Sequence, residues 1–260
     1  MFRLRKVYIL PNLFTAGSLF SGMLAILHVF AGDPENIRAA CWLILLSAFL
    51  DLADGFIARL TRTQSSFGLQ LDSLTDLVAF GVAPALLAFD AIQGRVPSVA
   101  AITACSFFVI CGALRLARFN VQAAREESRA FLGLPIPAAG LAVMAIVWNF
   151  VQMPFLDEYL RIELFLAPLL VLLAALMVSK VPYLGFKSIN LADRQPFEIL
   201  VSVVVVGILI FLLIEHLSLV LLAVIWIYIL AGLILMPYRR RVRRQLEKLT
   251  AIDPGSSPNP

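Results

Sequence analysis

The stretch DLADGFIARLTRTQSSFGLQLDSLTD, residues 51–76, decides how this chain folds and what it can do. It carries four carboxylates, Asp51, Asp54, Asp72 and Asp76, in two segments that are otherwise apolar and long enough to cross a membrane. One charged side chain in the hydrocarbon region costs roughly 2.5–3.5 kcal/mol on translocon scales. Four neighbouring acids therefore need cations or protons to neutralise their charge. The function of the site depends on which of these it binds.

The spacing of the four acids predicts that they face one another. Asp51 and Asp54 are three residues apart and Asp72 and Asp76 are four apart, so each pair shares one face of a helix. The short polar stretch 61–67 between the pairs predicts an antiparallel helical hairpin. Each pair then lies roughly 6–16 Å from the turn, at 1.5 Å per residue. We therefore expect both pairs at similar depth, near one membrane surface.

Four carboxylates without a nearby His or Cys offer only hard oxygen ligands. Such a set suits Mg²⁺ or Mn²⁺ and does not suit Zn²⁺ or copper. Two divalent ions would cancel the four negative charges, and two ions bridged by carboxylates commonly serve phosphoryl transfer. The alternative, in which the acids pair only with Arg59 and Arg62, leaves too many charges unmatched.

The pattern D-x2-D-G-x2-A-R-x8-G-x3-D-x3-D, met here at eight fixed positions, resembles the signature of the CDP-alcohol phosphotransferases, integral-membrane enzymes of phospholipid synthesis. The resemblance implies that Asp51, Asp54 and Asp72 hold the metal ions. It implies that Asp76 is a further ligand or the general base that deprotonates the acceptor alcohol. It also implies a pocket for the cytidine diphosphate moiety, formed by Gly55, Ala58, Arg59 and Gly68.

The composition is typical of a polytopic membrane protein. Of the 260 residues, 61% are hydrophobic and 15% are charged, whereas soluble domains have about 45–50% and 25%. Cys41, Cys105 and Cys111 lie in apolar stretches without the spacing of a disulfide or metal motif, so we interpret them as small buried hydrophobic residues. We expect an all-α bundle of about eight transmembrane helices.

The apolar runs and loops divide the chain into four regions. We expect an interfacial segment at residues 1–10, a catalytic domain of six spans at 11–195, two additional spans at 196–238, and a basic, then disordered tail at 239–260. After a first span at Leu13–Phe30, the other expected spans are Ile37–Arg62, Gly68–Phe89, Ser98–Asn120, Pro135–Val151, Leu160–Val181, Pro196–Ile214 and Leu217–Met236.

The basic residues predict the orientation of these spans. All but three of the 21 Lys and Arg residues fall on the side of the N-terminus, the exceptions being Arg38, Arg95 and Arg161. The positive-inside rule then places both termini and the 51–76 site at the cytosolic face of the cytoplasmic membrane. His28 and His216 fall at the opposite face, away from the chemistry. The run RRRVRR after the last span is expected to meet anionic lipid, and we expect no nucleic acid partner.

Four flanking stretches resemble the phosphatidylserine synthase branch of the family: LPNLFTAGSLFSG (10–22), LRLARFN (114–120), FLGLPIPAAG (131–140) and MVSKVPYLGFK (177–187). That resemblance implies transfer of a phosphatidyl group from CDP-diacylglycerol to L-serine, with release of CMP, by an enzyme that is commonly a homodimer. The candidate contacts to the acceptor or to phosphate are Arg118, Asn120, Gly133 and Pro135.

Other interpretations of these residues stay open. Arg118 could instead snorkel at the end of its span, which is the preferred interpretation for Arg115. Gly133 and Pro135 could simply begin a helix. Another acceptor, such as glycerol 3-phosphate or inositol phosphate, would fit the same core. A cation- or proton-coupled transporter is a different class, disfavoured because the acids lie at one face and no inverted repeat is evident.

Overall fold

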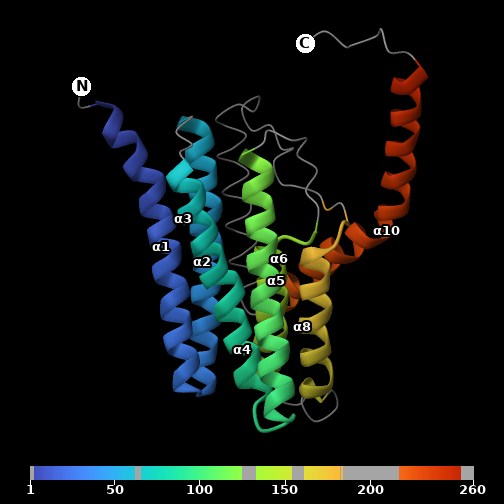
Figure 1. Ribbon diagram of the computed structural model, residues 1–260. Coiled ribbons are helices and arrows are strands. Elements are labelled where there is room, and N and C mark those ends of the chain that lie inside the picture. The colour runs from blue at the N-terminus through green and yellow to red at the C-terminus, as the bar shows by residue number, and fades with distance from the viewer. Residues whose placement is uncertain are drawn as a thin grey trace.

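The computed structural model describes residues 3–61, 66–124, 133–153, 161–181, 183 and 217–252 (Figure 1). Within these ranges the chain is helical, with no strand beyond one isolated bridge between Gln93 and Val96, which confirms the all-α prediction. The helices are α1 (Arg3–Ala31), α2 (Pro34–Thr61), α3 (Ser66–Asp76), η1 (Leu77–Val82), α4 (Ala83–Ile92), α5 (Ser98–Ala124), α6 (Ile136–Gln152), α8 (Ile162–Val178) and α10 (Leu217–Ile252).

Five stretches of the described chain are helical, long and apolar enough to cross a membrane: Asn12–Ala31, Pro34–Ile57, Phe67–Ile92, Ser98–Gln122 and Leu217–Ile234. Two apolar helices are shorter, at Ile136–Gln152 and Leu164–Val178. The apolar helices thus support the prediction of an integral membrane bundle, whereas eight spans stay a prediction. The expected seventh span, residues 196–214, and His216 lie outside the described residues.

The expected third span is not one regular α-helix. It consists of α3, the π-helix η1 and α4 in succession, and η1 begins directly after Asp76. Glycines on two neighbouring helices make room for its wide turn. A Cβ on Gly22 of α1 would lie 3.0 Å from Ala79, and a Cβ on Gly140 of α6 would overlap the Phe80 carbonyl oxygen. Single π turns often mark functional sites, and this one adjoins the acids.

Small residues hold α1 against α2. The hydroxyl oxygens of Ser18 and Ser47 lie 2.7 Å apart, and Ser21 donates a hydrogen bond to the Leu43 carbonyl oxygen at 3.0 Å. Small residues such as these permit the close approach of two helices. α1 is continuous from Arg3, so it includes most of the segment expected at the membrane surface.

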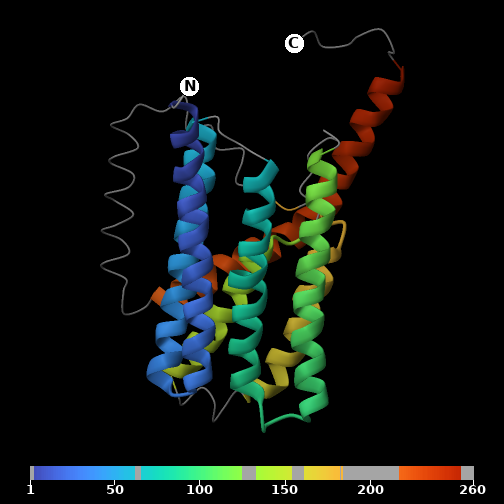
Figure 2. The same ribbon diagram turned by 60° about the vertical axis from the view of Figure 1, so that its left-hand side comes forward.

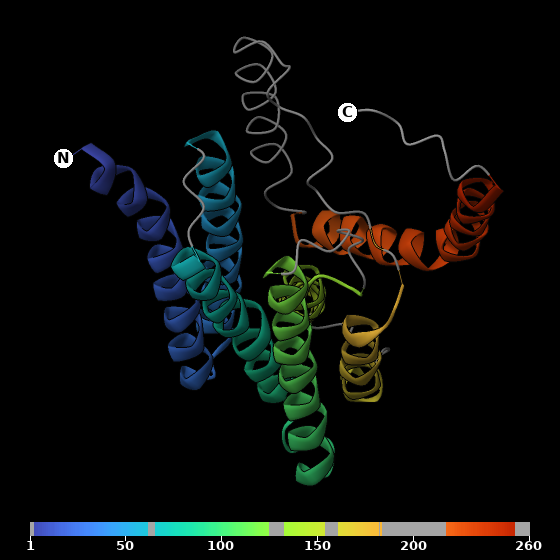
Figure 3. The ribbon, with the colours of Figure 1, turned by 45° about the horizontal axis from the view of Figure 1, so that its top comes forward.

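The helix α10 differs most from expectation. It crosses the bundle at a steep angle to α1 and α2 (Figure 2) and lies with α8 on the side opposite to them (Figure 3). Ser218 ties its start to α6, donating to Gln152 Oε1 at 2.7 Å. It continues through the basic run to Ile252, because Arg, Gln, Glu, Lys and Leu are good helix formers. The start of α1, the end of α2, the start of α3 and the end of α10 share one end of the molecule (Figure 1).

Candidate active site

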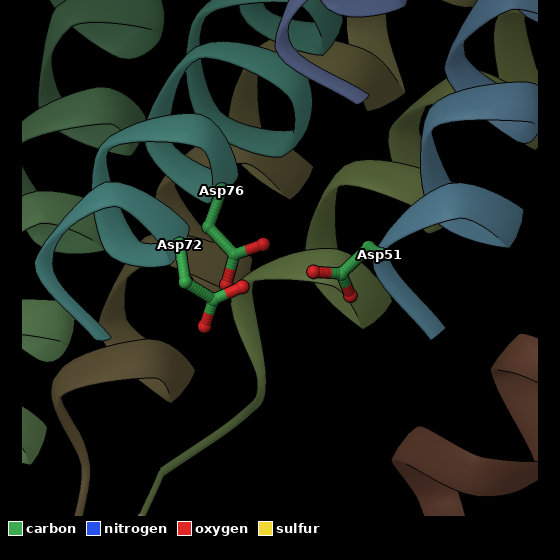
Figure 4. A group of neighbouring side chains, drawn as sticks. All are labelled: Asp51, Asp72 and Asp76. Carbon is green, nitrogen blue, oxygen red and sulfur yellow. The ribbon is translucent and has the colours of Figure 1, made fainter. Parts of the chain in front are cut away.

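Three of the four predicted acids converge. Asp51 of α2 points toward Asp72 and Asp76 of α3 (Figure 4), and one carboxylate oxygen from each lies within 4.8 Å of the other two. The helical spacing explains this, because Asp72 and Asp76 are one turn apart on α3 and present their carboxylates together. The predicted meeting of the two segments is therefore confirmed for these three residues.

The three acids repel one another, and one of their carboxylate oxygens is unpaired within the described part of the chain. All three are half-buried, and Asp76 Oδ1 is fully buried without a hydrogen-bond partner among the described residues. Like charges at this separation repel strongly where the dielectric constant is low. A cation with oxygen ligands would relieve both the repulsion and the unpaired oxygen. The donor set therefore fits a hard divalent ion such as Mg²⁺ or Mn²⁺.

Asp54 lies outside the group of three. Its side chain is only 6% exposed, and Thr15 of α1 donates a hydrogen bond to Oδ2 at 2.7 Å. Thr15 is itself 4% exposed, so this bond is shielded from water. Sequence reasoning missed Thr15, because the two residues are 39 positions apart and no spacing rule connects them.

Of the four residues predicted to bind the nucleotide, the structure describes only two in full. Gly55 follows Asp54 on α2, Gly68 lies one turn before Asp72 on α3, and both are half-buried. Ala58 and Arg59 continue α2 toward the same end, but their side chains lie outside the described part of the structure. All four positions therefore adjoin the acids along the chain, and their contact with a nucleotide stays a prediction.

Arg118 and Gly133 contact the end of α8. Arg118 Nη1 donates to the Val178 carbonyl oxygen at 3.1 Å, and Gly133 N donates to the Val181 carbonyl oxygen at 2.8 Å. Gly133 has a φ of +86°, and a Cβ there would overlap the Met177 carbonyl oxygen, so the turn requires glycine. The bond from Arg118 satisfies a carbonyl group at the C-terminal end of α8, whereas Val181 lies beyond that helix. Direct contact of Arg118 and Gly133 with substrate stays a prediction.

Asn120 and Pro135 also have structural partners. Asn120 Nδ2 donates to Ser73 Oγ at 3.0 Å and to Gln70 Oε1 at 3.4 Å, which joins α5 to the helix that carries Asp72. Pro135 is the N-cap of α6, with Pro137 in the first turn, as in the alternative interpretation. Asn120 thus helps to hold α3 in place, and the predicted substrate contacts of both residues remain untested.

Arg115 departs from its expected place. It is only 8% exposed, so the interpretation as a snorkelling anchor is wrong. It follows Phe108 and Cys111 on the buried face of α5, and this helical spacing was a signal that the sequence offered. Its Nε has no hydrogen-bond partner among the described residues, and its charge attracts that of Asp76. It is a candidate site residue that sequence reasoning considered but interpreted as an anchor.

Comparison with known proteins places these residues in a family. The family model of the CDP-alcohol phosphatidyltransferases matches residues 8–181. This chain belongs to that family. The CDP-alcohol phosphatidyltransferase match includes Thr15, the 51–76 stretch, Arg115 and Asn120, while α10 lies beyond it.

Several curated relatives of this CDP-alcohol phosphatidyltransferase carry the name CDP-diacylglycerol–serine O-phosphatidyltransferase. The protein of Helicobacter pylori is 42% identical over 190 residues, which cover 72% of this chain and 76% of the relative. That of Bacillus subtilis is 35% identical over 178 residues, or 68% of this chain and 91% of the relative. That of Mycobacterium tuberculosis is 28% identical over 246 residues, or 93% and 81%. The predicted phosphatidylserine synthase branch is thus supported.

Proposed function

We propose that this chain is a CDP-diacylglycerol–serine O-phosphatidyltransferase, which transfers a phosphatidyl group to L-serine and releases CMP. The observation that carries the proposal is the convergence of Asp51, Asp72 and Asp76 in a membrane protein of the CDP-alcohol phosphatidyltransferase family. The names of similar relatives support serine as the acceptor.

The acids form the metal site in this proposal. Asp51, Asp54 and Asp72 would hold two Mg²⁺ or Mn²⁺ ions, and Asp76 would be a further ligand or the base. When bound, the ions neutralise the diphosphate of the donor and the charge that develops on the departing CMP. Thr15 orients the Asp54 carboxylate through its hydrogen bond. The convergence of Asp51, Asp72 and Asp76 supports a site for a hard cation, because these donors are all oxygen atoms. The family pattern adds Asp54 to this site.

The reaction is a single exchange of phosphorus–oxygen bonds. Gly55, Ala58, Arg59 and Gly68 bind the cytidine diphosphate, and Asp76 accepts the proton of the serine hydroxyl group. The hydroxyl oxygen attacks the β-phosphorus and forms the new P–O bond. The bond from this phosphorus to the bridging oxygen breaks, and CMP leaves with the electron pair. The buried, unpaired Oδ1 of Asp76 supports its assignment as the base.

The distribution of Lys and Arg residues predicts how the chain is oriented in the membrane, and the resemblance to the family predicts how it assembles. We infer that both termini and the acids face the cytosol across the cytoplasmic membrane, because the basic residues gather on that side of the expected spans. The lipid tails of the donor then enter through a lateral opening between helices. We also infer a homodimer, as in the family.

The decisive test offers one donor and several alcohols. Purified protein with Mg²⁺ or Mn²⁺ and CDP-diacylglycerol is incubated with labelled L-serine, glycerol 3-phosphate or inositol phosphate, and the lipid product is identified. We expect phosphatidylserine and CMP in equal amounts. If another lipid forms instead, the acceptor is the alcohol found in that lipid and not serine. Metal flux into vesicles without CMP release would instead favour a transporter.

The base assignment has its own test. Asp76→Asn should lower turnover by about 10²–10⁴-fold, the usual contribution of a general base, while CDP-diacylglycerol still binds. Turnover near that of the unsubstituted protein would remove Asp76 from this role. The number of Mn²⁺ ions bound by the variant separates loss of a ligand from loss of a base.

A further inference from the structure

Arg115 is a buried cation that the proposed reaction does not yet use. Only 8% of its surface is exposed to solvent. Its Nε has no hydrogen-bond partner within the described ranges. Removing a guanidinium from water without pairing it costs several kcal/mol. The charge of Asp76 compensates part of this cost, but no acceptor within the described ranges forms a hydrogen bond with Nε. The position of Arg115 therefore indicates an anionic ligand.

The neighbours of Arg115 narrow the choice of anion. Its charge interacts with Asp76 of α3, with Arg118 one turn further along α5, and with Tyr228 of α10. Arg118 already donates to the Val178 carbonyl oxygen, whereas Arg115 has no such contact among the described residues. The charges of Arg115 and Asp76 thus interact, but within the described part of the chain no hydrogen bond joins the two residues. A ligand that joins the two must carry an acidic group close to a hydroxyl group.

Serine has this arrangement, because only two carbon atoms separate its hydroxyl oxygen from its carboxylate carbon. A carboxylate that enters a group of acids would be repelled unless a cation received it. We propose that Arg115 binds the carboxylate of the acceptor amino acid while Asp76 takes the proton of its hydroxyl group. The guanidinium suits this task, since its planar fork matches the two oxygens of a carboxylate. This inference rests on the proposed function, and it assigns to Arg115 the specificity of the enzyme for an amino acid as acceptor.

The experiment compares L-serine with L-serinamide, in which a neutral amide replaces the carboxylate. The unsubstituted protein should use serine far better than serinamide. Arg115→Met should raise the KM for serine about 10–100-fold, the effect of losing a hydrogen bond between charged groups. It should leave kcat/KM for serinamide nearly unchanged, so that discrimination disappears. Arg115→Lys keeps the charge without the fork and should restore part of the preference.

The controls separate a lost acceptor contact from a damaged fold or donor site. Arg161→Met removes the same charge at the N-cap of α8 and should leave the preference for serine intact. Binding of CDP-diacylglycerol and of Mn²⁺ to Arg115→Met should match the unsubstituted protein. If Arg115→Met does not fold, Arg115→Lys still decides, because its KM should rise for serine and not for serinamide.

Several results would overturn the inference. An unchanged preference in either Arg115 variant would do so, as would equal losses for serine and serinamide. Weaker binding of CDP-diacylglycerol with the preference retained would assign Arg115 to the donor diphosphate. Failure of the proposed function itself looks different, because the unsubstituted protein would then make no phosphatidylserine.

Discussion

The two ends of α2 use aspartate in opposite ways. At its start, the exposed Asp33 caps the helix: Oδ1 accepts the backbone N–H of Asn36 at 2.9 Å, and Oδ2 accepts its side-chain amide at 2.6 Å. Asn36 Oδ1 lies 2.5 Å from His28 Nδ1, which adds a contact with α1. Near its other end, Asp51 faces two further acids, and Asp54 is buried against Thr15.

The difference separates acids that the fold explains from acids that the fold does not explain. The oxygens of Asp33 are satisfied by donors of the helix itself, so the fold alone explains the residue. The acids at the other end repel one another and leave an oxygen of Asp76 unpaired, so the fold alone does not explain them. Residues that lower stability are commonly retained where function requires them. Substitutions at the two ends should therefore have opposite effects on stability and activity.

Between the two ends of α2, the largest effect is expected from Asp51→Asn. It should lower transfer by about 10²–10³-fold or more, because it removes a charge that the reaction needs. It should also raise the melting temperature of the metal-free protein. Two unit charges 4.8 Å apart repel by about 3 kcal/mol at an effective dielectric constant of 20. Thermal unfolding with a chelator present, followed by the transfer assay, measures both quantities.

Titration with Mn²⁺ provides the control for Asp51→Asn. A metal that binds only the folded state stabilises it by about 2.7 kcal/mol at 100 times its Kd. Mn²⁺ should therefore raise the melting temperature of the unsubstituted protein and of Asp33→Asn, and have little effect on Asp51→Asn. A persisting Mn²⁺ shift, or a less stable metal-free Asp51→Asn, would contradict the comparison.

A smaller effect is expected from Thr15→Val, which removes the hydroxyl group that holds Asp54. Loss of a hydrogen bond to a charged group should weaken Mn²⁺ binding about tenfold or more. Thr15→Ser keeps the hydroxyl group and should bind Mn²⁺ normally. Ser18→Ala, one turn away, loses a bond to Ser47 and should affect stability alone. Equal Mn²⁺ affinities for Thr15→Val and Ser18→Ala would show that Thr15 only packs.

Much of the fold was predictable because hydrophobic length dominates in a membrane protein. The helix boundaries around the acids followed from apolar runs and from the short polar stretch between them. The π turn at Leu77–Val82 did not, since it depends on Gly22 and Gly140, which approach it from distant parts of the sequence. The steep course of α10 was equally hidden, because span length carries no information about crossing angle.

The candidate site was predictable where it depends on local spacing. Asp72 and Asp76 meet because they are one helical turn apart, and the hairpin brings Asp51 to them. Thr15 and Arg115 act across helices, so no local spacing relates them to the acids. The sequence did place Arg115 in line with Phe108 and Cys111, and this helical stripe distinguishes a buried arginine from one that snorkels.

The smallest expected effect lies at the capped end of α2. Hydrogen bonds from the backbone and side chain of Asn36 lower the pKa of Asp33 below its ordinary 3.8. A depressed pKa stabilises the fold above the ordinary value, and this contribution is lost as the pH falls through the folded-state value. The melting temperature of the unsubstituted protein should exceed that of Asp33→Asn at neutral pH, and the difference should shrink below about pH 4. Other acids titrate alike in both proteins and cancel in this difference. A constant difference between pH 3 and 7 would show that the charge of Asp33 contributes nothing and that only its cap geometry matters.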